Sequence, residues 1–130
     1  MEEKRFKEWI ILKEKIHNIA RLRTIREGEV WWAALGENVG VEINGKNDGF
    51  TRPILVFKKL SRFSFLGVPL TTQEHYGTWY SSFEFKNKKQ FAALSQVRIL
   101  SVSRLNKRMG MLTHSDFDVV KAGFKRLYLG

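Results

Sequence analysis

The spacing of the apolar residues changes after the first quarter of the chain. Before that point Trp9, Leu12, Ile16 and Ile19 recur every three or four residues, which is the period of one face of an α-helix. This spacing predicts a helix over residues 3–24. Lysine, arginine and glutamate fill much of the rest, and this mixture favours packing against the following domain or a second copy over binding to a membrane surface.

The pattern then becomes one of short apolar segments separated by turn residues, which is typical of β-strands. A Gly/Asn/Asp-rich loop occupies residues 36–51, and its segment 45–49 is a turn signal. Short strands at such intervals favour a compact barrel or sandwich. The predicted strands are Glu29–Leu35, Pro53–Phe57, Phe63–Thr72, Thr78–Phe85 and Phe91–Ser101.

A second helix is predicted at the end of the chain. Thr113 is a suitable N-cap, with Asp116 three residues later. Apolar residues at Phe117, Val120, Phe124 and Leu127 then follow with helical spacing. Since no internal repeat or Pro/Ser-rich linker interrupts the sequence, we expect a single α+β, mainly β domain over residues 1–130 with helices at both ends.

The charge of the chain points to a polyanionic partner. Lysine and arginine outnumber the acidic residues by 23 to 13 in 130 residues, which gives a net charge of +10. A surplus this large favours binding to nucleic acid, because each neutralised phosphate releases condensed counterions. A basic protein with no nucleic-acid partner is an equally good explanation at this level.

Other features of the composition restrict the chemistry and the location. The chain has no cysteine, which excludes disulfides, thiolate zinc sites and cysteine nucleophiles and suits a reducing cytoplasm. The apolar run Ile10–Leu12 is too short for a signal peptide or a membrane span. We therefore expect a cytoplasmic protein.

Most catalytic signatures are missing from the sequence. It contains no P-loop, no GxSxG or HExxH motif and no close cluster of His, Asp and Glu suited to a metal, so we expect neither a metal nor a cofactor. The histidines His17, His75 and His114 are scattered. Only His75, in a predicted loop, is a candidate general base, and an ordinary exposed histidine is the more common case.

A few polar residues stand where predicted strands meet loops. Arg52 precedes an apolar strand, Thr71 and Thr72 end another, and Gln96 interrupts an apolar run just before Arg98. Each has a structural explanation: a surface ion pair for Arg52, an edge-strand position for Thr71 and a satisfied buried amide for Gln96.

Taken together and in order, these pieces resemble the MazF/PemK family of toxin endoribonucleases. The resemblance runs from Gly28 to the carboxyl terminus. Its motifs are Gly28-Glu29-Val30-Trp31, then Gly40, Glu42 and Gly49 before Arg52-Pro53, then Pro69-Leu70-Thr71-Thr72-Gln73, and finally Gln96-Val97-Arg98. The loop between Glu42 and Arg52 is longer than is common in the family, and the helix over residues 3–24 has no counterpart in short members.

The resemblance implies an SH3-like small barrel over residues 28–130 that forms a homodimer. It also implies metal-independent cleavage of single-stranded RNA, commonly mRNA, at short sequence motifs, and neutralisation by a cognate antitoxin. The implied catalytic residues are Arg52, Thr71 and Gln96. The implied substrate-binding residues are Glu42, Thr72, Gln73, His75 and Arg98, and bases could stack on Trp32, Tyr76, Trp79 or Tyr80.

Three other functions remain open from the sequence. A CcdB-like toxin that inhibits DNA gyrase would share the fold class without needing Arg52 and Thr71. A non-catalytic RNA-binding barrel would bind RNA and leave it uncut, and a degenerate toxin could persist as a scaffold.

Overall fold

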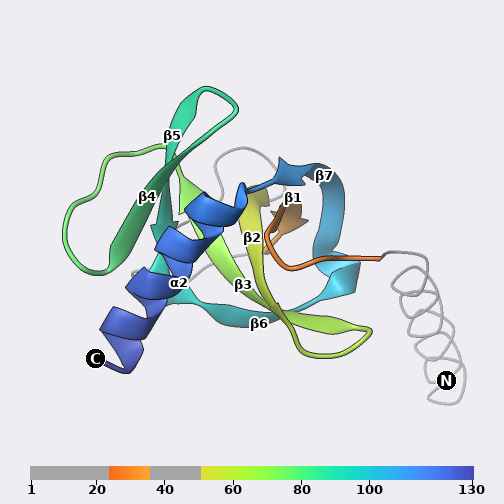
Figure 1. Ribbon diagram of the computed structural model, residues 1–130. Helices are drawn as coiled ribbons and strands as arrows, with labels where there is room; N and C mark the ends of the chain where they lie inside the picture. The colour runs from red at the N-terminus through yellow and green to blue at the C-terminus, as the bar shows by residue number, and fades with distance from the viewer. Residues whose placement is uncertain (1–23, 36–50) are drawn as a thin grey trace, which may run out of the picture.

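The computed structural model describes residues 24–35 and 51–130 (Figure 1). The helix predicted over residues 3–24, the turn at 45–49 and Glu42 lie outside the described residues. The strands are β1 Glu29–Ala34, β2 Thr51–Lys59, β3 Ser64–Thr71, β4 Tyr80–Phe85, β5 Lys88–Ala93, β6 Arg98–Ser101 and β7 Leu105–Met111. Two 3-10 turns, η1 Leu94–Gln96 and η2 Val102–Arg104, flank β6, and helix α2 His114–Tyr128 closes the chain.

The seven strands form one antiparallel sheet in the order β4-β5-β3-β2-β1-β7, with β6 also paired to β3. The edge of β3 is divided between two partners: Ser64–Gly67 pairs with β6, and Leu70–Thr71 pairs with β5. The predicted mainly β fold with a carboxyl-terminal helix is therefore confirmed. The sheet is open rather than a closed barrel, because β4 and β7 end the order without pairing to each other in the described chain.

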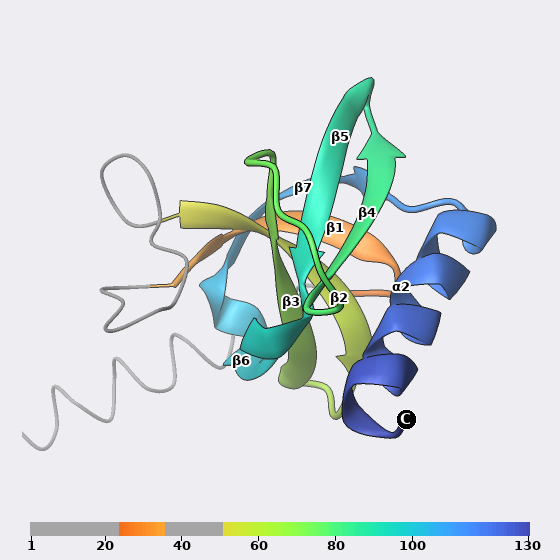
Figure 2. The same cartoon turned by 90° about the vertical axis from the view of Figure 1, so that its left-hand side faces the viewer.

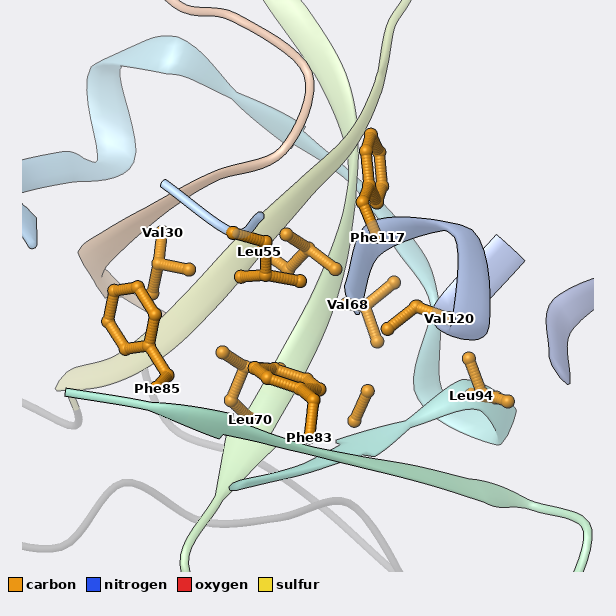
Figure 3. Close-up of a cluster of buried hydrophobic side chains, with 11 residues drawn as sticks. Val30, Leu55, Val68, Leu70, Phe83, Phe85, Leu94, Phe117 and Val120 are labelled. Carbon is orange, nitrogen blue, oxygen red and sulfur yellow. The ribbon is translucent and has the colours of Figure 1, made fainter. Parts of the chain in front are cut away.

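The curved sheet has a hydrophobic cluster on each face, and β2 contributes to both. Leu55 belongs to the cluster that lies under α2 (Figure 3), whereas Ile54 and Val56 belong to the second. Alternate side chains of a strand point to opposite faces, so a strand buried on both faces is apolar at every position. This explains the unbroken run Pro53–Phe57.

One strand prediction was wrong, and one strand was not predicted. The segment Phe91–Ser101 is not one strand, because η1 turns the chain from the β4 side of the sheet to β6. Strand β7 was not expected at all. Most of its residues are exposed and carry no apolar alternation, and it is held by backbone pairing with β1.

Helix α2 forms as its cap and spacing predict. The Asp116 backbone N–H donates to Oγ1 of Thr113 at 3.1 Å. Phe117 and Val120 of the helix are buried. At the other end the Tyr128 hydroxyl donates to the Leu94 carbonyl at 2.6 Å, which ties the helix to η1. Figure 2 shows α2 along one side of the sheet. No helix within residues 24–35 and 51–130 is long and apolar enough to cross a membrane.

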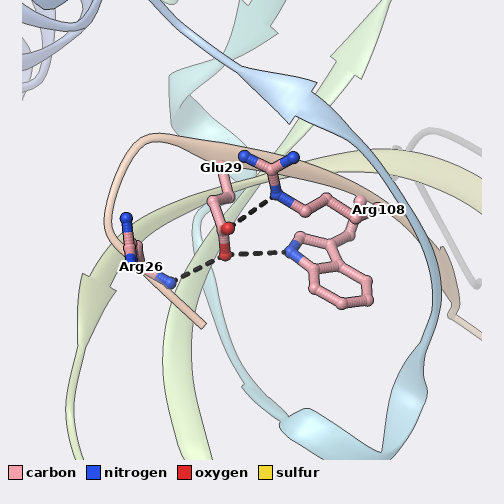
Figure 4. A network of polar contacts seen from close by, with 4 residues as sticks. Arg26, Glu29 and Arg108 are labelled. Carbon is pink, nitrogen blue, oxygen red and sulfur yellow. Dashed lines mark hydrogen bonds and ion pairs between the residues drawn. The ribbon is translucent and has the colours of Figure 1, made fainter. Parts of the chain in front are cut away.

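The buried carboxylate of Glu29 links strand β1 to strand β7. Oε2 of Glu29 accepts from Nε of Arg108 at 2.7 Å, and its Oε1 accepts from the Arg26 backbone N–H at 2.7 Å and from Nε1 of Trp31 at 3.2 Å (Figure 4). Burial raises the pKa of Glu29, but the hydrogen bonds from Arg26, Arg108 and Trp31 outweigh burial, and the net pKa lies below its ordinary value.

The Glu29 network gives stability a pH dependence. Because the pKa of Glu29 is lower in the folded than in the unfolded protein, its stabilisation is complete above the unfolded pKa and is lost as the pH falls through the folded pKa. We expect Glu29→Gln to lower the free energy of unfolding by about 1–3 kcal/mol at pH 7, and this deficit to shrink below about pH 4. Urea titrations of both proteins across this pH range measure it, with the exposed Glu84→Gln as control. A deficit that does not change with pH would contradict the account.

Gly67 lies where three buried side chains leave no room for a Cβ. A Cβ there would stand 2.8 Å from Cγ2 of Ile54 and 3.0 Å from Cδ1 of Leu100. We expect Gly67→Ala to lower the free energy of unfolding by about 1–3 kcal/mol through overpacking. Urea denaturation checks this beside Ser82→Ala, an exposed change on β4 that should be neutral within about 0.5 kcal/mol. A neutral Gly67→Ala would show that the second cluster is loosely packed.

Candidate active site

The pairing of β2 with β3 brings Arg52 and Thr71 to the same end of the sheet. Ile54 pairs with Pro69 across the two antiparallel strands. Arg52 lies two residues before Ile54, and Thr71 lies two residues after Pro69. Both therefore share the face of that pair, since side chains alternate along a strand. The two motifs noted in the sequence, Arg-Pro and Pro-x-Thr-Thr, thus meet in space.

Arg52 and Thr71 line a hollow of about 340 Å³. Its described lining includes three basic side chains and no Asp or Glu. The polar and charged members are Thr51, Arg52, Thr71, Thr72, Lys86, Lys88 and Gln90. The apolar members are Trp32, Pro53, Leu70, Phe85 and Met109.

The guanidinium of Arg52 is buried without a full set of partners. The residue is only 8% exposed, and its Nε has no hydrogen-bond partner among the described residues. Burial lowers the pKa of Arg52, although an arginine stays protonated at neutral pH. A charge held away from water attracts an anion more strongly than an exposed one does. Arg52 is therefore prepared to bind an anionic group in the hollow.

Thr71 ends β3 and lines the same hollow as Arg52. It is 5% exposed, and its Oγ1 accepts from the Gln73 backbone N–H at 3.1 Å. A hydroxyl can accept and donate at the same time, so its hydrogen can still be donated to a ligand. The local bond restrains the Thr71 side chain, and Gln73 itself is exposed.

Two lysines of the hollow come from a hairpin whose role the sequence did not reveal. Strands β4 and β5 are joined by Lys86 and Asn87, with φ of 52° and 64°. Positive φ at both positions defines a two-residue turn that follows the twist of the strands. The sequence signals a turn at this point, but it carries no sign that Lys86 and Lys88 line a hollow with Arg52.

Gln90 is the second residue that sequence reasoning missed. It lies on β5, is 5% exposed and lines the hollow, and its Oε1 has no hydrogen-bond partner in the described chain. A polar residue next to the buried run Phe91–Leu94 is the one signal that could have pointed to it.

The structure does not bring all the predicted residues together. Thr72 lines the hollow with Arg52 and Thr71, whereas Gln96 lies in η1 and Arg98 begins β6, and neither lines it. His75 also stands outside the lining. Its ring stacks on Tyr80 with 4.2 Å between ring centroids.

The aromatic candidates divide in the same way. Trp32 forms part of the hollow and is 37% exposed. Tyr76 and Trp79 lie in the exposed segment before β4, and Tyr80 is partly covered by His75. Of these four candidates, Trp32 is therefore the one placed to contact a group bound in the hollow with Arg52.

Comparison with known proteins identifies the fold. The family model of the PemK-like, MazF-like toxin of type II toxin–antitoxin systems matches residues 26–128 of the chain. No curated protein sequence matches the chain.

Several solved structures share the fold at low sequence identity. An endoribonuclease in complex with its cognate antitoxin, from a Mycobacterial species, has a TM-score of 0.65 at 15% identity, covering 82% of this chain and 98% of its own. MazF from Deinococcus radiodurans has a TM-score of 0.63 at 15% identity, covering 81% and 96%. Mycobacterium tuberculosis toxin MazF-mt6 has a TM-score of 0.58 at 14% identity, covering 77% and 95%.

Anion binding in the hollow should be measurable as stabilisation. A ligand that binds only the folded state raises its stability by mass action. We expect inorganic phosphate to raise the melting temperature of the wild-type protein above that in chloride of equal ionic strength. Arg52→Met should abolish most of this increase, because it removes the buried cation. The exposed Lys59→Met should retain it, and an equal response in both variants would place the anion site elsewhere.

Proposed function

The chain belongs to the PemK-like, MazF-like family of toxins of type II toxin–antitoxin systems, and we propose that it is an endoribonuclease that cuts single-stranded RNA at the hollow around Arg52. The observation that carries the proposal is a buried cation without a partner at Nε, which shares with Thr71 a hollow whose described lining has no acidic residue. The Mycobacterial endoribonuclease solved with its cognate antitoxin shares this fold, which supports the same proposal.

Arg52 and Thr71 would act on the scissile phosphate. The guanidinium would donate two parallel hydrogen bonds to the non-bridging oxygens, and the Thr71 hydroxyl would donate a third. These bonds strengthen as charge builds on the phosphorane, and that difference lowers the barrier. Lys86 and Lys88 would hold the neighbouring backbone phosphates.

The substrate itself supplies the nucleophile. The 2′-oxygen attacks phosphorus and loses its proton, the bond to the 5′-oxygen breaks, and that oxygen gains a proton. The products are a 2′,3′-cyclic phosphate and a 5′-hydroxyl, and no metal is required. Glu42, His75 and water are the candidates for moving the two protons. Of these, His75 would have to act from outside the hollow lining.

The remaining candidates and partners complete the proposal. Gln96 would position a base or a phosphate, and Thr72, Gln73 and Arg98 would contact the substrate beyond the cleaved bond. A cytoplasmic homodimer, silenced by a cognate antitoxin, fits the family and the net charge of +10. The antitoxin-bound fold relative supports an antitoxin partner of this kind.

The direct test is incubation of the purified protein with a long single-stranded RNA in EDTA. We expect fragments that begin with a 5′-hydroxyl. Arg52→Ala should reduce the rate by about 10²–10³-fold, as is typical for removing one donor to the transition state. Arg52→Lys should restore little activity because an ammonium cannot form the two parallel bonds. Thr71→Val should slow cleavage while leaving the fold intact.

The exposed Arg62→Ala is the control for loss of one positive charge and should cut like the wild type. Cleavage that requires a divalent metal would contradict the proposed chemistry. RNA that is bound but left intact by every folded variant would favour a binding protein. An Arg52→Ala protein that still poisons cells would favour a gyrase inhibitor.

A further inference from the structure

Two buried polar atoms in the hollow lack partners in the described chain, and they have opposite hydrogen-bonding character. Nε of Arg52 is a donor, and Oε1 of Gln90 is an acceptor. They do not bond to each other, although both residues line the same hollow. Buried polar groups without partners are uncommon in folded proteins. A ligand that satisfies both atoms must therefore offer an acceptor and a donor.

A phosphate satisfies only the first of these atoms. Its oxygens accept from Arg52, but a phosphodiester has no hydrogen to give to Gln90. The second group must carry an N–H or O–H. The apolar walls formed by Trp32, Pro53 and Leu70 suit the flat face of a nucleobase. A volume of about 340 Å³ is at the low end for ligand sites and fits a group of nucleotide size.

The strand register puts Gln90 close to the end of β3, where Thr71 lies. Thr71 on β3 pairs with Phe91 on β5, and Gln90 is the residue before Phe91. Gln90 therefore lies near the end of β3, and it lines the hollow together with Thr71. The last torsion of a glutamine side chain is broad, so the amide can turn toward a bound group.

We propose that Gln90 selects the nucleotide at the cleaved bond by accepting a hydrogen bond from an N–H group of its base. The inference rests on the proposed function, since it concerns the substrate of the same hollow. A base that presents an N–H at the position facing Oε1 satisfies this atom, whereas a base that presents an acceptor there leaves the oxygen buried and unpaired. A site built to hydrogen-bond one group discriminates against a base that leaves its buried acceptor unpaired. The preference should be about tenfold to a hundredfold in kcat/KM.

The test combines a protein change with a substrate change. Short RNAs with each of the four bases at the nucleotides flanking the cut first identify the preferred base. That base is then replaced by an analogue whose amino group is removed or whose ring N–H is methylated. We expect the analogue to reduce kcat/KM by about tenfold to a hundredfold for the wild type and to have little further effect on Gln90→Met.

Gln90→Met keeps the length of the side chain, and its stability is measured alongside, so that loss of fold is separated from loss of recognition. Asn106→Leu removes an exposed amide outside the hollow and should keep the wild-type preference. If folded Gln90→Met cuts with an unchanged preference, or the analogue penalises both proteins equally, the inference is overturned while the endoribonuclease stands. If the wild type leaves both the short RNAs and the long single-stranded RNA uncut, the proposed function fails and the inference fails with it.

Discussion

The burial of Arg52 is the constraint on which the site depends. Removing a guanidinium from water is costly unless its hydrogen bonds are replaced, and its Nε finds no replacement in the described chain. The Glu29 carboxylate, which is also buried in this sheet, is by contrast fully paired: it accepts from three donors. Glu29 is paired within the described chain, whereas Nε of Arg52 is not. A ligand can supply the missing hydrogen bond, and such unsatisfied groups are expected at functional sites.

Strand pairing and the buried residues that follow Arg52 on β2 hold its backbone in place. Arg52 pairs with Ala33 of β1, and the fully buried Ile54 and Leu55 follow it on β2. Thr71 ends the adjacent strand, and the β4–β5 hairpin then adds lysines and Gln90 from a different part of the chain. The site therefore combines a rigid element that places the cation with a hairpin that supplies charge and recognition.

The sequence predicted the parts of this structure that repeat a pattern. The capped helix α2 and the run Pro53–Phe57 follow from local spacing, and the Arg52 and Thr71 motifs follow from their resemblance to a toxin family. Strand β7 could not be predicted, because its residues are mostly exposed and its place is determined by pairing with β1. Gln90 was missed for a related reason: only the pairing of β5 with β3 brings it to the hollow that Arg52 also lines. Gln96, which looked equivalent to Thr71 in the sequence, lies instead in a 3-10 turn outside the hollow.

The account is tested most directly by observing the side-chain N–H signals of Arg52 and Gln90 by NMR during titration with an RNA that cannot be cut, because the nucleotide at the cleaved bond has a 2′-deoxyribose. The account predicts that the Nε–H of Arg52 and the amide of Gln90 shift together and saturate at the same RNA concentration. Signals that stay in place while residues on α2 or β7 respond would show that RNA binds elsewhere, and would contradict the assignment of the hollow as the active site.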